Sequence, residues 1–195
     1  MIDTKLRKSV QPIFDTLAKG FVKLKITPNT ITGLAFVIGT CSAIFIGLNF
    51  MMPALICLWL SGLFDVLDGT VARINGQSTP VGAYMDLILD RMVEAAVILG
   101  FYHAFPEYTL MYLLFFIAVL FNFTTFIVAG AIFKNDGKKS MYYDVGIAER
   151  TETFIVFSLM MLLTSYIYWI LLVFNAIVFL TGIIRFYKVI KYTKE

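Results

Sequence analysis

Six long apolar runs, separated by short polar or turn-forming breaks, restrict the folds open to this sequence. Several of them reach or exceed the roughly 20 residues that an α-helix needs to cross the hydrocarbon core of a bilayer. Hydrophobic residues make up 59% of the chain and charged residues 15%, a composition unlike that of a soluble globular domain. We therefore predict an all-α integral membrane protein, one domain over residues 1–195. Its six transmembrane helices are expected at residues 30–49, 51–74, 80–104, 108–133, 147–165 and 167–187.

The N-terminal segment, residues 1–25, has a different pattern. It mixes basic residues with apolar residues at helical spacing and lacks the uninterrupted apolar core of a signal peptide. Such a sequence is typical of an amphipathic helix that lies on the membrane surface. We expect this helix to precede a transmembrane core of residues 30–187.

The basic residues indicate how the spans are oriented. With six spans, all 16 lysines and arginines fall on one side of the membrane, in the N-terminal segment, in or beside two polar links, and at the C-terminal end. The positive-inside rule assigns that side to the cytoplasm. We therefore predict a multi-pass protein of the cell membrane with both termini in the cytoplasm, and we expect no nucleic-acid partner.

Four aspartates lie at the cytoplasmic ends of the second and third spans. Asp65 and Asp68 are three residues apart, and both belong to the second span. Asp86 and Asp90 are four residues apart in the third span. Both spacings place side chains on one helical face. The link closed by Pro80 is short enough to make the two helices antiparallel neighbours, so we expect all four carboxylates to converge.

Converging carboxylates repel one another unless cations neutralise them. Oxygen-only ligands favour a hard divalent ion, so we expect Mg²⁺, two ions rather than one, with Mn²⁺ as the alternative. The competing interpretation is that the aspartates cap helices or pair with Arg73 and Arg91. The lack of four compensating bases nearby favours the metal site. Gly69 and Gly82 offer bare backbone to a phosphate group, and Arg73 supplies a cation.

These residues form one motif of fixed spacing. It reads Asp65-Val-Leu-Asp68-Gly69-Thr-Val-Ala72-Arg73, followed after eight residues by Gly82, after three more by Asp86 and after three more by Asp90. The motif resembles the complete signature of the CDP-alcohol phosphatidyltransferase family. The chain length and the six predicted spans are similar to that family as well.

The resemblance implies a role for each motif residue. Asp65, Asp68 and Asp86 are similar to metal ligands, and Asp90 is similar to a catalytic base that also touches the metal site. The residues that would hold the CDP-lipid are Asn29, Thr30, Ile31, Thr32, Gly69, Arg73, Thr79 and Gly82, with Ser78 as the alternative to Thr79. For residues 27–32, a proline-initiated helix start capped by Asn and Thr is an equally good interpretation.

The implied reaction moves a phosphatidyl-type group from CDP-diacylglycerol, or a similar CDP-lipid, to a small alcohol. Asp90 removes a proton from the acceptor hydroxyl, that oxygen attacks the lipid-side phosphorus, and CMP leaves. Lys134, Arg150 and Arg185 resemble the acceptor-phosphate pocket of the phosphatidylinositol-phosphate synthase branch, although the positive-inside rule also accounts for them. Inositol phosphate is therefore favoured over glycerol 3-phosphate as the acceptor. An unphosphorylated alcohol is a further alternative.

Two other functions use intramembrane carboxylates. A prenyltransferase binds Mg-pyrophosphate through Asp-rich pairs, but it generally needs more spans. An ion or proton transporter needs a polar path to the far side, yet beyond the motif the second and third spans carry little except Ser61 and Glu94. Glu94 either supports Asp90 or pairs with Arg91 or a neighbouring helix.

The family resemblance also implies a homodimer that contacts membrane lipids.

Overall fold

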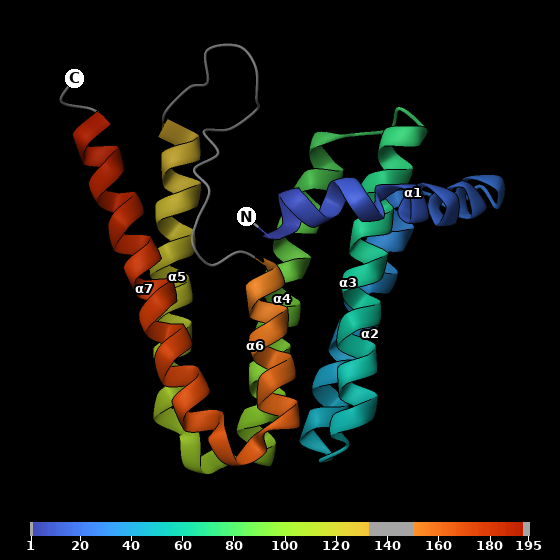
Figure 1. Cartoon of the computed structure of the whole chain (residues 1–195). Coiled ribbons are helices and arrows are strands. Elements are labelled where there is room, and N and C mark those ends of the chain that lie inside the picture. Colours follow the sequence, from blue (N-terminus) through green and yellow to red (C-terminus); the bar gives the residue numbers. More distant parts are fainter. Residues whose placement is uncertain (1, 133–149, 193–195) are drawn as a thin grey trace. The chain divides into compact units, whose positions relative to one another are not determined.

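Helices form all the regular structure in the described part of the chain (Figure 1). The computed structural model describes the backbone of residues 2–132 and 150–192, and the side chains of residues 11–132 and 151–191. The helices are α1 (Ile2–Lys23), α2 (Pro28–Gly47), α3 (Met51–Ile74), α4 (Pro80–Ala104), α5 (Thr109–Ile132), α6 (Arg150–Leu162) and α7 (Ile167–Tyr192). Two short 3₁₀ helices, η1 (Pro106–Tyr108) and η2 (Thr164–Tyr166), precede α5 and α7. The all-α prediction is confirmed for these residues.

The helices begin and end close to the predicted spans, and α3 and α4 match them at both ends. Local chemistry explains the break between these two helices. Gly76 has φ +62°, a left-handed conformation that glycine adopts without a Cβ clash. Thr79 then caps α4 by accepting a hydrogen bond from the Gly82 amide at 3.1 Å, and Pro80 takes the first helical position.

Four helical segments of the described chain are long and apolar enough to cross a membrane: Pro28–Gly47, Met51–Ile74, Pro106–Ile132 and Thr164–Lys191. Helix α4 has 25 residues but carries a group of charged side chains between residues 86 and 94. Helix α6 is apolar but has 13 residues, and the start of its predicted span lies outside the described residues. The chain is therefore a membrane protein, and composition supports four of its six predicted spans.

The chain divides into two compact units, and the first, Ile2–Glu107, contains α1 to α4. Within it α2 packs against both α3 and α4. Small residues at every fourth position of α2 permit this close approach: Ala35, Gly39, Ala43 and Gly47. As expected from their short link, α3 and α4 run antiparallel, because α3 is antiparallel to α2 whereas α4 is parallel to it. Each of them packs more extensively on α2 than on the other, and their carboxylates converge.

Hydrogen bonds from buried hydroxyl groups join α2 to α3. Ser61 Oγ donates to the carbonyl oxygen of Ala35 at 2.7 Å, and Ser42 Oγ donates to that of Ala54 at 2.8 Å. The order of these pairs shows that α2 and α3 are antiparallel. Helix α1 lies across this pair in Figure 1, and Ala18 packs in a core cluster with residues of α2 and α3.

The second unit contains α5, α6 and α7. Helices α5 and α7 run parallel, because Asn175 Nδ2 donates to the Met111 carbonyl and Arg185, further along α7, donates to Asn122, further along α5. Gly182 provides the room for this packing, since a Cβ there would lie 2.6 Å from the Phe121 ring.

Candidate metal centre and adjoining pocket

Three carboxylates from two helices converge at one end of the first unit. Asp65 and Asp68 lie near the end of α3, and Asp86 lies near the start of α4. One oxygen from each lies within 4.8 Å of the others. Asp68 is buried at 6% exposure, and the other two are half-buried. Three anions this close favour a bound cation, and their oxygen-only donor set fits a hard divalent metal ion.

Asp90 lies one turn beyond Asp86 on α4 and is half-buried. The structure does not group it with the three converging carboxylates, so its roles as fourth ligand and base stay predictions.

One turn further along α4, Glu94 is 3% exposed and forms an ion pair with Arg91 at 2.8 Å. The pairing of Glu94 with Arg91, one of the two roles considered for this carboxylate, is thus confirmed.

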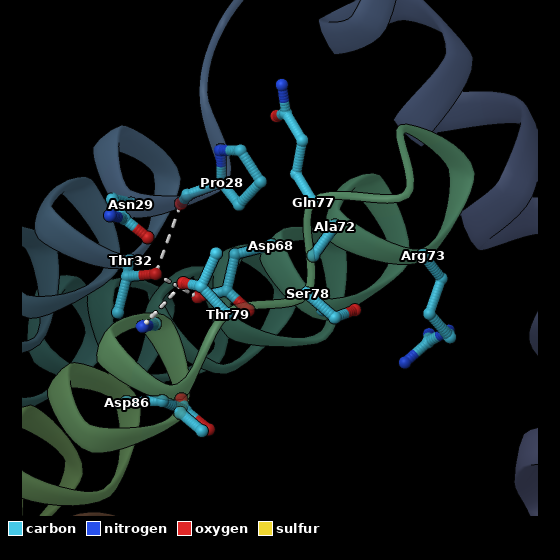
Figure 2. A pocket seen from close by; sticks show the side chains of 13 residues that line it. Pro28, Asn29, Thr32, Asp68, Ala72, Arg73, Gln77, Ser78, Thr79 and Asp86 are labelled. Carbon is cyan, nitrogen blue, oxygen red and sulfur yellow. Dashed lines mark hydrogen bonds between the residues drawn. The ribbon is translucent and has the colours of Figure 1, made fainter.

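A pocket of about 210 Å³ adjoins the carboxylates (Figure 2). Its wall comes from the start of α2, the end of α3, the link after it and the start of α4. Six predicted CDP-lipid residues line it: Asn29, Thr32, Gly69, Arg73, Thr79 and Gly82. Asp68 and Asp86 line it as well. The pocket therefore joins the candidate metal ligands to the predicted nucleotide residues.

Three features of the pocket suit a phosphate group. The first turns of α2 and α4 both face it, and the N-terminus of a helix favours anions. Gly82 leaves room where α4 approaches α2, because a Cβ there would lie 3.3 Å from Asn29 Oδ1. Arg73 is exposed on the pocket wall and donates a hydrogen bond to Thr70 Oγ1 at 2.9 Å. The pocket thus combines helix N-termini with a cation.

Residues 27–32 divide between several roles. Thr27 caps α2 by accepting from the Thr30 amide at 3.3 Å, and Pro28 opens the helix, so the proline-initiated start is confirmed with threonine as its cap. Ile31 is fully buried in the core cluster rather than in the pocket, since it packs against α1 and α3. Thr32 Oγ1 donates to Asp68 Oδ2 at 2.5 Å. Of the four residues predicted here to contact the lipid donor, only Asn29 and Thr32 line the pocket.

Ser78, the alternative to Thr79, also lines the cavity, as do Pro28 and Ala72 of the two sequence motifs. The sequence prediction did not include two further lining residues, Gln77 and Ala83. Gln77 follows Gly76 in the link, and its amide donates to the Ala72 carbonyl at 2.9 Å. Only the position of Gln77 between the two halves of the motif could have indicated that it lines the pocket.

The predicted acceptor residues belong to the second unit. Lys134 and the side chain of Arg150 lie outside the described residues. Arg185 is 8% exposed, and its Nη1 donates to Asn122 Oδ1 at 2.9 Å and to the Asn122 carbonyl at 3.1 Å. Its guanidinium also lies 5.3 Å from the centre of the Phe126 ring, within range of a cation–π interaction. Arg185 is therefore a fixed, buried cation on α7.

A sequence model of the CDP-alcohol phosphatidyltransferase family matches residues 25–183. The chain belongs to this family. It is therefore a membrane enzyme that transfers a substituted phosphate group from a CDP-linked lipid to an alcohol. This confirms the family prediction made from the aspartate motif and decides against the transporter and prenyltransferase alternatives.

Two relatives illustrate the range of similarity. The inner membrane protein YnjF of Escherichia coli (strain K12) is 32% identical over 95% of this chain and 93% of its own length. The phosphatidylinositol phosphate synthase of Corynebacterium glutamicum is 36% identical over 47% of this chain and 42% of its own length. The chain therefore matches the second relative over less than half the length of that protein.

Solved structures share the fold at lower identity. The phosphatidylinositol phosphate synthase of Mycobacterium tuberculosis with bound CDP-DAG has a TM-score of 0.77 at 21% identity, covering 91% of this chain and 94% of that one. The same enzyme in complex with manganese and citrate has a TM-score of 0.76, also at 21% identity, and covers 90% of this chain and 88% of that one. The likeness extends over both units of the chain.

Proposed function

We propose that this chain transfers a phosphatidyl group from CDP-diacylglycerol, or a similar CDP-lipid, to inositol phosphate with release of CMP. The pocket carries the proposal, because it places candidate metal ligands beside Gly69, Gly82 and Arg73 in one cavity. The CDP end of the donor would occupy this cavity, with its pyrophosphate toward the carboxylates and its acyl chains in the membrane.

The carboxylates Asp65, Asp68 and Asp86 would hold two Mg²⁺ ions, with Asp90 as a further ligand. Manganese in the mycobacterial relative supports a divalent ion here. Bound metal would neutralise the negative charge of the pyrophosphate and the negative charge that develops during transfer. Asp90 would take the proton from the acceptor hydroxyl, whose oxygen forms the new bond to the lipid-side phosphorus as the bond to CMP breaks.

Inositol phosphate is the favoured acceptor for two reasons. The Corynebacterium relative is named a phosphatidylinositol phosphate synthase. Arg185, held by Asn122, offers a buried cation suited to an acceptor that carries its own phosphate. Lys134 and Arg150 would complete that binding site. Glycerol 3-phosphate is the second candidate, because it presents the same phosphate chemistry.

The acceptor is tested by identifying the lipid product. Purified protein with CDP-diacylglycerol and Mg²⁺ is offered inositol phosphate, glycerol 3-phosphate, serine and inositol in turn, and products are identified by mass spectrometry. We expect phosphatidylinositol phosphate to dominate, and Asp90→Asn to lower its formation by about 10² to 10⁴. A phosphatidylglycerol phosphate product would overturn the acceptor assignment, and full activity of Asp90→Asn would overturn the role of the base.

The membrane arrangement is part of the proposal. Helices α2 to α7 would form six spans, with both termini and the pocket at the cytoplasmic face of the cell membrane. Helix α1 would lie on the membrane surface. Its exposed Ile13 and Leu17 would face the lipid while Ala18 packs on the core. The homodimer stays a prediction from the family resemblance.

Arg73 allows a separate test of donor binding. We expect Arg73→Ala to raise the KM for the CDP-lipid by about tenfold, because a hydrogen-bonded cation for the donor phosphates is lost. The Kd for Mn²⁺ should stay unchanged, since Arg73 bears no metal-binding atom. The matched control is Lys23→Ala, which removes an exposed cation of the same unit outside the pocket. Equal KM values for the two variants would contradict the assignment.

A further inference from the structure

The hydroxyl of Thr32 connects α2 to the metal centre. Thr32 Oγ1 donates to Asp68 Oδ2 at 2.5 Å, and each residue is 6% exposed (Figure 2). The same hydroxyl lies 3.1 Å from the carbonyl oxygen of Pro28, one turn earlier in α2. A hydroxyl has one hydrogen to donate, and the shorter contact to an ionised acceptor takes it.

We infer that Thr32 is a positioning residue for the metal site, which holds the carboxylate of Asp68 in the orientation that converges with Asp65 and Asp86. This inference rests on the proposed metal-dependent function. It assigns Thr32 a different role from the donor contact that the sequence motif suggested. The residue would act on the metal through Asp68 rather than on the nucleotide.

Electrostatics explain why Asp68 needs such a partner. Its oxygen lies within 4.8 Å of oxygens from two other carboxylates, so in the absence of metal repulsion favours rotation of the Asp68 side chain away from them. A hydrogen bond from a neighbouring helix opposes that rotation. Thr32 is suited to this task because its β-branched side chain has few rotamers in a helix. Outer-shell hydrogen bonds of this kind typically change metal affinity by about 10- to 100-fold.

Thr40 provides a matched control on the same helix. Its hydroxyl donates to the Phe36 carbonyl at 2.9 Å, the same four-residue relation that Thr32 has to Pro28. Thr40 does not line the pocket. Thr40→Val therefore reports the effect of losing a threonine hydroxyl from α2, whereas Thr32→Val also removes the bond to Asp68.

The test is a titration of purified full-length protein with Mn²⁺, following free Mn²⁺ by electron paramagnetic resonance without any lipid substrate. We expect Thr32→Val to raise the Kd for Mn²⁺ by about 10- to 100-fold. Thr32→Ser and Thr40→Val should keep Kd values close to that of the unmodified protein. If Thr32→Val does not fold, the pair Thr32→Ala and Thr32→Ser makes the same comparison of a missing and a retained hydroxyl.

Kinetics then separate the two roles of Thr32. At saturating Mn²⁺, Thr32→Val should change the KM for the CDP-lipid much less than Arg73→Ala does. An unchanged Kd for Mn²⁺ with a raised KM would overturn the inference and restore Thr32 as a donor contact. The titration needs no substrate, so it does not depend on catalysis. If Thr32→Val lowered the affinity for Mn²⁺ while the unmodified protein released no CMP, this inference would stand and the proposed function would fail.

Discussion

Replacing Asp68 with asparagine is expected to abolish metal binding and transfer without unfolding the protein. The substitution keeps the size of the side chain, and the amide oxygen still accepts the hydrogen bond from Thr32. It removes one of three converging negative charges. We expect the Kd for Mn²⁺ to rise and the rate of CMP release to fall by at least about 100-fold each, since the metal is worth several kcal/mol to such a reaction.

Thermal stability provides the diagnostic readout for Asp68→Asn. The metal-free variant should be as stable as the unmodified protein, or more so, because repulsion with Asp65 and Asp86 is reduced. Added Mg²⁺ should raise the melting temperature of the unmodified protein only, since a ligand stabilises the state that binds it. Glu107→Gln, which neutralises an exposed carboxylate outside the cluster, should behave as the unmodified protein. A metal-induced shift retained by Asp68→Asn would contradict the assigned site.

Gly100→Ala is expected to have the largest effect on stability. A Cβ at Gly100 would collide with the carbonyl oxygen of Ala43 on α2, and the carbonyl carbon of Ala43 would lie 3.1 Å away. Backbone atoms cannot rotate aside as a side chain can, so α2 and α4 would have to separate. Overpacking of this kind costs about 1–3 kcal/mol, and we expect the upper end of that range.

The matched variant for this prediction is Gly33→Ala. Gly33 lies on α2, and an added Cβ there meets no heavy atom of the described residues within 4 Å apart from the adjoining backbone of its own helix. Its stability should be equal to or slightly above that of the unmodified protein, because alanine favours the helix. The two variants are compared by thermal unfolding in detergent. A Gly100→Ala protein as stable as Gly33→Ala would contradict the close packing of α2 on α4.

Local sequence signals predicted the helices and the carboxylates well. Thr79 and Pro80 mark the start of α4 through cap chemistry that depends on neighbouring residues alone. The spacing of Asp65 and Asp68 places both on one face of α3 whatever surrounds it. Their convergence with Asp86 followed from the short link between the helices.

Contacts between helices were harder to predict, because they depend on which faces meet. The small residues of α2 gave no indication that this helix packs against both α3 and α4. The bond from Thr32 to Asp68 spans 36 residues of sequence, and the motif alone does not distinguish a donor contact from a metal-site partner. In the same way, Asn122 became visible as the partner of Arg185 only once α5 and α7 were placed side by side.

Acceptor-dependent release of CMP is the most direct test of whether this pocket transfers a phosphatidyl group. Purified protein is given CDP-diacylglycerol and inositol phosphate, and CMP is quantified with Mg²⁺ and again after removal of the metal with a chelator. We expect one CMP for each phosphatidylinositol phosphate formed, and none without acceptor or without metal. If folded protein that binds Mn²⁺ released no CMP with inositol phosphate, glycerol 3-phosphate or an unphosphorylated alcohol, the assignment of this pocket as the transfer site would be contradicted.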